Sequence, residues 1–302
     1  MNDHSARHRS SEARPRRAAV ASDPSGSRSA ELERLAALFG AAPLAVLTGA
    51  GISTDSGIPD YRGAGTPPRT PMSIAQFMED PAYRRRFWAG ARVGALRAAG
   101  VAPNSGHLAL ARFEAAGLTN GVITQNVDNL HRRAGSRSVV ELHGNGNVIR
   151  CTEHDHRFTR DQVLGWFDDL NPGFAARNAG AEIAPDGDAL VSETATVEAP
   201  SCPECGSILR PDVVYFGELV PRPVFETAEA LVAAAGGLLL IGTSLAVNTG
   251  IRLVHRAQLR GIPIAVINRG PTAIDARESV TVRIDAGAAE TLAALERILG
   301  SS

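Results

Sequence analysis

The sequence contains no lysine. All 31 of its basic residues are arginine, 32 residues are acidic, and the formal net charge is −1. Without lysine, no side chain of this protein can itself be acylated on a lysine amine, and a phosphate loop ending in G-K-[ST] is excluded. The near-zero charge produces no overall basic field, so no direct nucleic-acid partner is expected.

Cysteine is also scarce, with three among 302 residues, and two of these stand in "CPEC" (202–205). This number fits a reducing compartment and a bound metal better than a disulfide framework. No apolar run reaches the ~18 residues that span a bilayer, so no membrane partner is expected. The longest run, "LVAAAGGLLLIG" (231–242), contains three glycines and predicts a helix end followed by a buried strand.

The first thirty residues are rich in Arg, Ser and Pro and nearly free of large apolar side chains, so they are expected to stay disordered. An Arg- and Ser-rich leader is also similar to a transit peptide. This one lacks amphipathic spacing and contains Asp3, Glu12 and Asp23. We therefore expect a disordered tail on a cytoplasmic protein.

Short apolar runs recur along the rest of the chain, each followed by a glycine-rich or polar turn. Seven of them predict buried strands: "PLAVLTGAG" (43–51), "GVITQNVD" (121–128), "SVVELHGN" (138–145), "DVVYFGE" (212–218), "GLLLIGTSL" (237–245), "PIAVINRG" (263–270) and "VTVRIDA" (280–286). Helical patterns such as "AELERLAALFGA" (30–41) lie between several of them. This alternation predicts an α/β fold with a doubly wound, Rossmann-like parallel sheet, which binds ligands outside the carboxyl ends of its strands.

Two segments interrupt the alternation. Residues 66–104 begin with "TPPRTP" and continue as a helical insertion, and residues 148–209 hold all three cysteines and an acidic linker. We therefore expect a disordered tail over 1–30, a Rossmann-like domain over 31–147 and 210–302, and a metal-stapled module over 148–209.

The turn after the first strand, "LTGAGISTDSGIPDYRG" (47–63), is rich in glycine. Gly49 and Gly51 permit a sharp turn and a close backbone approach to a dinucleotide pyrophosphate. The third glycine is displaced from the G-x-G-x-x-G fingerprint, and a tight strand-to-helix connection without a ligand is the alternative. Asp60, Tyr61 and Arg62 add polar groups that a purely structural turn does not need, which favours nucleotide binding.

The loop "TQNVDNLHRRAG" (124–135) follows a second strand and carries Gln125, Asn126 and Asp128, whose amide and carboxylate groups can hold a ribose or a carboxamide. An Asn/Asp-rich turn would explain one of these residues but hardly all three. His143, in "ELHGN", ends another buried strand, where a histidine can titrate near neutral pH and reach a ligand as a general base. A histidine at a strand end is more often structural.

Two further histidines are expected to have structural roles. His107 follows "PNSG" and is expected to cap or pack a helix, and His131 is expected to pack near the second loop.

Five motifs stand in the order and spacing of one protein family: "GAGISTDSGIPDYRG" (49–63), "TQNVDNLH" (124–131), "LHG" (142–144), "GTSL" (242–245) and "INRG" (267–270). This set resembles the sirtuins, which are NAD-dependent protein-lysine deacylases, over about residues 31–300. "PDVVYFGE" (211–218) and "VINRGPT" (266–272) are most similar to the branch that includes the mitochondrial lipoamidase-type (class II) members and many bacterial enzymes.

The resemblance implies that NAD is consumed as a co-substrate and that acyl-lysine proteins or peptides are the substrates. The acyl-lysine carbonyl oxygen attacks C1′ of the nicotinamide ribose, and nicotinamide leaves. His143 then deprotonates a ribose hydroxyl, which attacks the resulting imidate, and water completes the reaction to free lysine and O-acyl-ADP-ribose. His143, Asn126 and Asp128 are the expected catalytic residues.

The resemblance also places NAD contacts in the loops at the strand ends. Ile58 and Asp60 would seat the carboxamide. The expected NAD-binding residues are Gly49, Ala50, Gly51, Ile52, Ser53, Asp55, Gly57, Ile58, Pro59, Asp60, Tyr61, Arg62, Gln125, Asn126, Val127, Asp128, Gly242, Thr243, Ser244, Asn268, Arg269, Gly270 and Ala286. Position 129, often Gly in the family, is Asn here, which tolerates a left-handed backbone better than most residues.

In sirtuins two C-x-x-C pairs bind one structural zinc, whereas this chain has "RCTEH" (150–154) and "CPEC". Cys₃His is an ordinary closed zinc site, so the expected ligands of one structural Zn²⁺ are Cys151, His154, Cys202 and Cys205. His156 could replace His154, and a weak or absent site stays open. A redox pair is the alternative for "CPEC", but it belongs at a helix start, and the sequence around it is typical of a zinc-ribbon knuckle.

The segment "VVYFGE" (213–218) resembles the strand on which sirtuins lay the substrate backbone by β-augmentation. Desuccinylase-type members hold an acyl carboxylate with a Tyr-x-x-Arg pair. The nearest candidate, "YRRR" (83–86), lies in an expected helix start, which favours acetyl or other uncharged acyl groups. Two other outputs stay open: ADP-ribosyl transfer or NAD hydrolysis, and a catalytically silent module that binds NAD or acyl-lysine.

Overall fold

The computed structural model describes residues 24–60, 73–98, 100–182 and 189–300. Most of the expected tail lies outside these residues, as do Tyr61 and Arg62. Residues 24–30, assigned to the tail by composition, instead belong to the first helix, α1 (Pro24–Ala41). Within the described ranges, no helix combines the length and apolar character needed to cross a bilayer.

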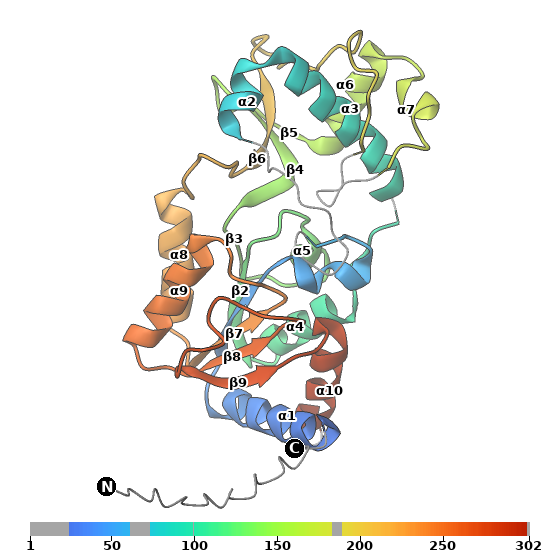
Figure 1. Cartoon of the computed structure of the whole chain (residues 1–302). Helices are drawn as coiled ribbons and strands as arrows, with labels where there is room; N and C mark the ends of the chain where they lie inside the picture. Colours follow the sequence, from blue (N-terminus) through green and yellow to red (C-terminus); the bar gives the residue numbers. More distant parts are fainter. Residues whose placement is uncertain (1–23, 61–72, 99, 183–188, 301–302) are drawn as a thin grey trace, which may run out of the picture.

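A six-stranded parallel sheet forms the larger lobe (Figure 1), in the order β3-β2-β1-β7-β8-β9. Its strands are β1 (Leu44–Thr48), β2 (Thr119–Thr124), β3 (Val139–Glu141), β7 (Gly237–Ile241), β8 (Ile264–Ile267) and β9 (Val280–Ile284). They coincide with six of the seven expected strands, and the doubly wound parallel fold is confirmed.

The seventh expectation, a strand of this sheet at 212–218, is wrong. Only its first two residues are in a strand, β6 (Leu209–Val213), which pairs antiparallel with β4 (Gly144–Cys151) in a separate sheet of order β5-β4-β6. The remainder is a loop. An apolar run indicates a buried strand but carries no information about the sheet it joins.

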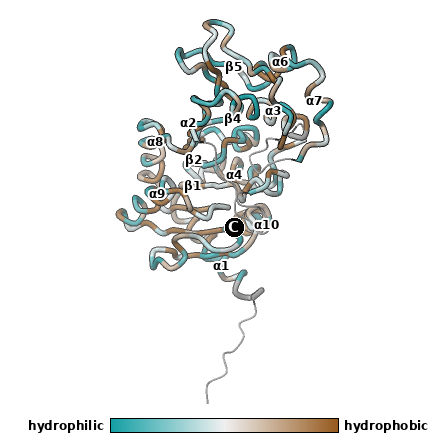
Figure 2. The backbone as a smooth tube through the Cα atoms, turned by 45° about the horizontal axis from the view of Figure 1, so that its top comes forward, coloured by the Kyte–Doolittle hydropathy of each residue, from teal (hydrophilic) through white to brown (hydrophobic). Residues whose placement is uncertain are grey.

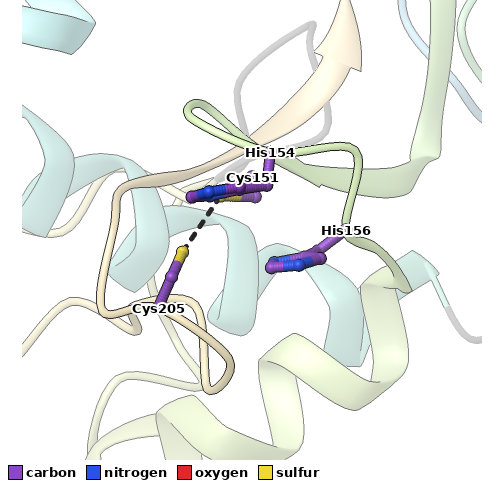
Figure 3. Close-up of side chains that lie close together, drawn as sticks. All are labelled: Cys151, His154, His156 and Cys205. Atoms are coloured by element: carbon purple, nitrogen blue, oxygen red, sulfur yellow. Dashed lines mark hydrogen bonds between the residues drawn. The ribbon is translucent and has the colours of Figure 1, made fainter.

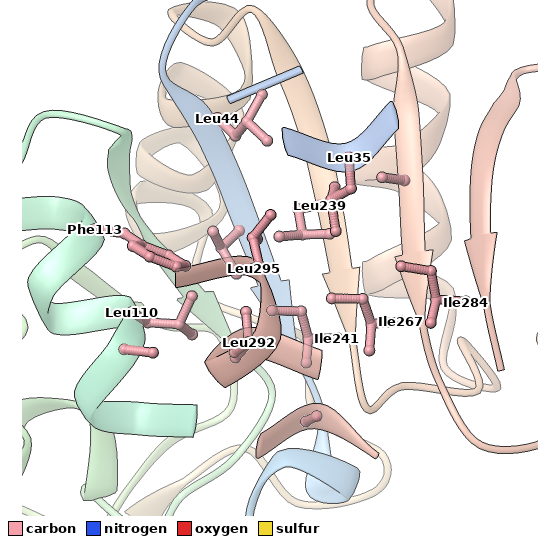
Figure 4. Close-up of a cluster of buried hydrophobic side chains, with 14 of the residues drawn as sticks. Leu35, Leu44, Leu110, Phe113, Leu239, Ile241, Ile267, Ile284, Leu292 and Leu295 are labelled. Atoms are coloured by element: carbon pink, nitrogen blue, oxygen red, sulfur yellow. The ribbon is translucent and has the colours of Figure 1, made fainter. Parts of the chain in front are cut away.

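Helices cover both faces of the parallel sheet (Figure 1). α8 (Arg222–Ala233) and α9 (Asn248–Leu259) cover one face, and α1, α4 (Ser105–Ala115) and α10 (Ala288–Gly300) cover the other. Hydrophobic and hydrophilic residues alternate along α8 and α9 in Figure 2, as expected for helices that bury one side. On the opposite face, the close-up in Figure 4 shows Leu110 and Phe113 of α4 and Leu292 and Leu295 of α10 beside the strands.

The smaller lobe joins the two segments that interrupt the alternation. It contains β4, β5 (Arg157–Thr159), β6, α2 (Ile74–Glu79), α3 (Pro81–Ala98), α6 (Arg160–Leu170) and α7 (Phe174–Arg177). Phe77, Trp88 and Phe167 share one buried cluster with Cys151 and Cys202. The helical insertion thus packs against the cysteine-bearing module (Figure 1).

The carboxyl ends of the six parallel strands are level. Across the sheet, the pairing joins their last residues, namely Glu141, Thr124, Thr48, Ile241, Ile267 and Ile284. The loops that follow therefore begin along a single edge. Strand order reverses between β1 and β7, and a sheet of this kind binds its ligand at that switch point.

Candidate active site

The turns after β1 and β7 are pressed together at the switch point. Gly51 N donates to Gly242 O (2.9 Å), and Gly49 N donates to Ile241 O (3.0 Å). Gly242 has φ 59°, and a Cβ added to it would lie 2.4 Å from the backbone nitrogen of Ile52. One added to Gly51 would lie 2.7 Å from Cα of Gly242. The contact between the two loops requires these glycines, independently of any bound pyrophosphate.

Ser53 is the centre of a buried hydrogen-bond network. Its hydroxyl donates to Asp128 Oδ2 (2.7 Å) and accepts a hydrogen bond from Asn126 Nδ2 (3.1 Å). Asn126 Nδ2 also donates to Gly49 O (3.1 Å), and Asp128 Oδ1 accepts from the N–H of Leu130 (2.9 Å). Because Ser53 is fully buried, it orients Asn126 and Asp128, the two expected catalytic side chains of the β2 loop.

His107 and His131 lie next to this network with their ring centroids 4.8 Å apart. His107 Nδ1 accepts from the N–H of Asn104 in the capping box of α4, and its Nε2 is 3.5 Å from Ser53 Oγ. Burial lowers the pKa of His107 to about 4 and that of His131 to about 3, so both are neutral near pH 7. The expectation that the first caps a helix and the second packs near the loop is confirmed.

The rest of the β2 loop is tied to its surroundings. Val127 O accepts from the N–H of Gly146 in β4 (2.9 Å), which joins the loop to the smaller lobe. Asn129 has φ 62° and precedes the short helix α5 (Leu130–Arg133), so the left-handed backbone expected at this position is confirmed.

His143 lies beyond the end of β3 with both ring nitrogens engaged. Nδ1 is 2.9 Å from Gln125 O and Nε2 is 3.3 Å from Thr249 Oγ1. Because a carbonyl oxygen only accepts, Nδ1 carries the ring proton and Nε2 carries the lone pair. Burial lowers the pKa of His143 from its ordinary value, partly offset by the Gln125 carbonyl. The imidazole is therefore neutral near pH 7, the protonation state that a general base requires.

Gln125 links the β2 loop to the β7 loop. Its Oε1 accepts from Thr243 Oγ1 (2.8 Å), and its backbone N–H donates to Thr48 O (2.9 Å). Thr243 Oγ1 also accepts from the N–H of Leu245, a buried residue with φ 56°. A non-glycine residue with such a backbone is strained and needs firm support from its surroundings. The carbonyl that holds His143 is thus fixed through a second loop.

The loops after β8 and β9 continue the same edge. Asn268 Nδ2 donates to the carbonyls of Arg269 (2.9 Å) and Gly270 (3.0 Å), so it stabilises its own turn. The Arg269 side chain is 67 % exposed and Ala286 is buried. Ser244 lies in the neighbouring β7 loop, and its carbonyl accepts from Ala273 N. Arg269 is therefore an accessible cation at this end.

The other expected NAD residues form the turn after β1. Two short 3₁₀ helices, Ala50–Ile52 and Thr54–Ser56, precede Gly57, which has φ 86°. Asp55, Gly57 and Pro59 are exposed, whereas Ile58 and Asp60 are partly buried. The described part of this loop ends at Asp60, so the placement of Tyr61 and Arg62 stays a prediction.

A partly buried ion pair supports the loop after β6. Arg210 is 5 % exposed and donates to Glu218 through both terminal nitrogens (2.7 and 2.6 Å). Glu218 Oε2 also accepts from the N–H of Tyr215 (2.9 Å), and the Arg210 guanidinium lies over the Tyr215 ring. The neighbouring Phe216 is 54 % exposed. The loop resembling a peptide-binding strand thus has a fixed base and an exposed apolar edge.

The smaller lobe brings all three cysteines and two histidines together, and Figure 3 shows Cys151, His154, His156 and Cys205 of this group. The Sγ atoms of Cys151 and Cys205 are 3.5 Å apart, and His156 Nδ1 is 3.3 Å from Cys202 Sγ. Cys202 also contacts the other two thiols. One ligand atom from each of Cys151, His154, His156 and Cys205 lies within 4.8 Å of the others.

The arrangement of the three cysteines and two histidines fits a zinc site. Four ligand atoms in a tetrahedron with Zn–S bonds of ≈ 2.3 Å are about 3.8 Å apart, close to the 3.5 Å and 3.3 Å separations of the two contacting pairs. The "CPEC" cysteines lie in a turn after residue 201 and do not begin a helix. The arrangement of a thioredoxin-like redox pair, with its cysteines at a helix start, is therefore not the one observed.

Sequence reasoning missed Thr249, the partner of His143 Nε2. The two residues are 106 positions apart, and no spacing rule connects a residue near the start of α9 with a strand end. The role of Ser53 as a hub was also missed, because the motif suggested a direct NAD contact. Its two hydrogen-bond partners, Asn126 and Asp128, are partly buried, and nothing in the sequence indicated this burial.

The Tyr83–Arg86 pair lies within the first turns of α3, as expected, with the Arg86 guanidinium 5.3 Å from the Tyr83 ring centroid. The Arg86 guanidinium is thus stacked on the Tyr83 ring at the surface of the smaller lobe.

Comparison of this sequence with known proteins identifies one family. The Sir2 family model matches residues 49–249. NAD-dependent protein deacetylase 1 of Mycobacterium avium (strain 104) is 48 % identical over 269 residues, covering 88 % of this chain and 95 % of the relative. NAD-dependent protein deacylase Sirt4 of Drosophila melanogaster is 40 % identical over 249 residues, covering 80 % of this chain and 79 % of the relative.

Solved structures lead to the same family. A Sir2 complex with a p53 peptide and NAD⁺ superposes with a TM-score of 0.71 at 30 % identity, covering 90 % of this chain and 99 % of that one. Sir2 bound to an acetylated peptide gives a TM-score of 0.70 at 29 % identity, with the same coverage. Since the family match spans most of the chain and includes every strand-end loop of the switch point, this protein belongs to the Sir2 family, the sirtuins.

Proposed function

We propose that this chain is an NAD-dependent protein-lysine deacetylase that consumes NAD and gives nicotinamide, O-acyl-ADP-ribose and free lysine. The observation that carries the proposal is His143, a neutral imidazole whose Nε2 lone pair lies beside the switch point of a Sir2-family sheet. Its relatives are named as deacetylases, and related structures hold acetylated peptide.

The site residues divide into three tasks in this proposal. His143 is the general base that takes a proton from a ribose hydroxyl at Nε2. Asn126 and Asp128 bind the ribose, in the orientation set by Ser53. Correct orientation of this kind supplies much of the rate when two substrates must meet.

The NAD-binding surface is proposed to follow the edge of the sheet from the β3 end to the β9 end. The Gly49–Gly51 turn and Gly242 line the pyrophosphate position at the switch point. Arg269, as the exposed cation near the β8 end, lies where the adenosine ribose is expected.

The acyl-lysine peptide is proposed to bind along the loop after β6. Its supports are the partly buried Arg210–Glu218 pair and the exposed edge at Phe216. The Tyr83–Arg86 pair is stacked within α3, which supports an uncharged acyl group such as acetyl.

We further propose one structural zinc per chain, held by Cys151, Cys202, Cys205 and one histidine. Sequence spacing favours His154. The contacts favour His156, because its Nδ1 touches Cys202 Sγ and its side chain is partly buried, while His154 is exposed and stacked on it. The zinc would staple β4 to the "CPEC" turn and so stabilise the lobe built from 148–209 and α2–α3.

Three free thiols as metal ligands suit a reducing compartment, and we propose a cytoplasmic location on that ground.

The test is product analysis. The protein is incubated with NAD and an acetyl-lysine peptide, and mass spectrometry should detect nicotinamide, O-acetyl-ADP-ribose and the deacetylated peptide. His143→Ala should abolish deacetylation with the fold intact by circular dichroism. Full deacetylation by this variant would refute the assigned base, and ADP-ribose on protein, or free in solution without peptide turnover, would indicate the ADP-ribosyl transfer or NAD hydrolysis alternative.

A further inference from the structure

Thr249 touches the nitrogen that the proposed chemistry uses. Its Oγ1 is 3.3 Å from His143 Nε2, and the other ring nitrogen, Nδ1, is 2.9 Å from Gln125 O. The carbonyl fixes the proton on Nδ1, so Nε2 can only accept. The Thr249 hydroxyl must therefore donate to Nε2 in the neutral state of the ring.

Thr249 is held firmly in this position by the start of α9. A Cβ added to Gly250, the next residue, would lie 3.2 Å from Gln125 Nε2 and 2.8 Å from a Leu245 methyl carbon, so the helix start packs directly on the β2 and β7 loops. The same Gln125 holds His143 Nδ1. Hydrogen bonds thus hold the imidazole at both nitrogens. They come from elements that are packed against each other, which fixes the plane of the ring.

The helix itself does not need this hydroxyl. The N-cap of α9 is Val247, and no side chain caps the helix there. Thr249 Oγ1 is instead directed to His143, and a threonine is only an average helix former. The contact with the imidazole is therefore the interaction that distinguishes threonine from an apolar residue at position 249.

We propose that Thr249 is a positioning residue for the general base. Its hydroxyl donates to the single Nε2 lone pair before the ribose binds and so holds the plane of the ring. The ribose hydroxyl then replaces it at that lone pair, and the ribose O–H bond breaks as the proton moves to Nε2. Once the ribose oxygen has bonded to the imidate carbon, the Thr249 hydroxyl rotates and accepts from the new Nε2–H. A hydroxyl can do both because it carries one donor and two acceptor lone pairs. The inference rests on the proposed role of His143.

The test compares Thr249→Val, which keeps the shape and removes the hydroxyl, with Thr249→Ser, which keeps the hydroxyl. Thr227→Val on α8 is the matched control, because the Thr227 hydroxyl donates to a backbone carbonyl of its own helix, Pro223 O. Two rates are measured for each variant: deacetylation, which needs the base, and exchange of labelled nicotinamide into NAD, which precedes it.

Thr249→Val should lower the kcat of deacetylation about three- to tenfold, the effect of one lost hydrogen bond, with unchanged KM values and unchanged exchange. Thr249→Ser and Thr227→Val should stay within about twofold of the parent protein. Deacetylation at the parent rate in Thr249→Val overturns the proposal. An equal fall of both rates, or a failure of Thr249→Ser to restore deacetylation, assigns Thr249 a purely structural role and overturns it too.

A spectroscopic measurement tests the contact independently of any activity. In ¹⁵N-labelled protein, the His143 Nε2 resonance should move in Thr249→Val toward that of an imidazole nitrogen without a hydrogen bond, and should not move in Thr227→Val. If the parent protein lacks deacetylase activity, the proposed function fails while this measurement still decides the contact. An unmoved resonance refutes the contact whatever the activity.

Discussion

Gly242→Ala should damage the protein far more than an ordinary glycine substitution, because two separate penalties coincide at this position. Its φ of 59° lies in the left-handed region, which costs an L-residue about 1–2 kcal/mol. The added Cβ would also lie 2.4 Å from Ile52 N and 2.6 Å from Gly51 C, which are backbone atoms and cannot rotate away. Overpacking of this kind costs a further 1–3 kcal/mol, roughly.

Gly261→Ala is the matched control. Gly261 has φ 67°, and no atom of the described residues lies within 4 Å of the Cβ position, so the backbone penalty alone is expected. We expect losses of about 2–5 kcal/mol for Gly242→Ala and about 1–2 kcal/mol for Gly261→Ala. Thermal unfolding followed by circular dichroism compares them, at about 2–4 °C of Tm per kcal/mol for a large domain.

The same substitution should weaken NAD binding, because the clash separates the two turns that line the switch point and moves Gly49 away from Asn126. Calorimetric titration should show at least a roughly tenfold higher Kd for Gly242→Ala and an unchanged Kd for Gly261→Ala. If Gly242→Ala has the same Tm as Gly261→Ala and binds NAD as tightly as the parent protein, the turns after β1 and β7 are not packed together as described.

Three further perturbations test other parts of the site. Glu218→Gln leaves Arg210 charged and buried, so the free energy of unfolding should fall by about 2–4 kcal/mol at pH 7. Burial raises the pKa of Glu218, but hydrogen bonds from Arg210 and Tyr215 outweigh it and lower the net value. The stabilisation by the ion pair is therefore present above the ordinary pKa of a glutamate and is lost as the pH falls through the lowered pKa of Glu218. If the difference in unfolding free energy between the parent protein and Glu218→Gln does not change with pH, the result argues against the ion pair. Burial lowers the pKa of His143, so the base stays neutral to lower pH and kcat/KM should fall only below about pH 6.5; a fall that begins near pH 8 would contradict this assignment. By elemental analysis, His156→Ala should lose bound zinc and His154→Ala should keep it, whereas the reverse result would make His154 the fourth ligand.

The sequence predicts the edge of the sheet well because each signal is local. An apolar run followed by a glycine or polar turn identifies a strand and its carboxyl end, and parallel strands bring those ends together. Gln125, His143 and Gly242 can therefore be assigned to one site from their positions along the chain. The family resemblance supplied the chemistry that the residues alone left open.

The sequence could not predict contacts made between distant segments. Thr249 reaches His143 only because α9 packs on the β2 loop, and the apolar run at 212–218 gave no sign that it would leave the parallel sheet. The choice between His154 and His156 depends on the course of the loop between β4 and β5. Both histidines are within reach of Cys151 by spacing, and the contact with Cys202 and the greater burial of His156 separate them.

NAD cleavage at this site is expected to be coupled to deacylation of an acyl-lysine substrate. The most direct measurement is the ratio of nicotinamide released to acetyl-peptide deacetylated, with nicotinamide also followed in the absence of peptide. We predict one nicotinamide and one O-acetyl-ADP-ribose per peptide, and almost no release without peptide. Nicotinamide release at the same rate with and without the peptide would contradict this coupling.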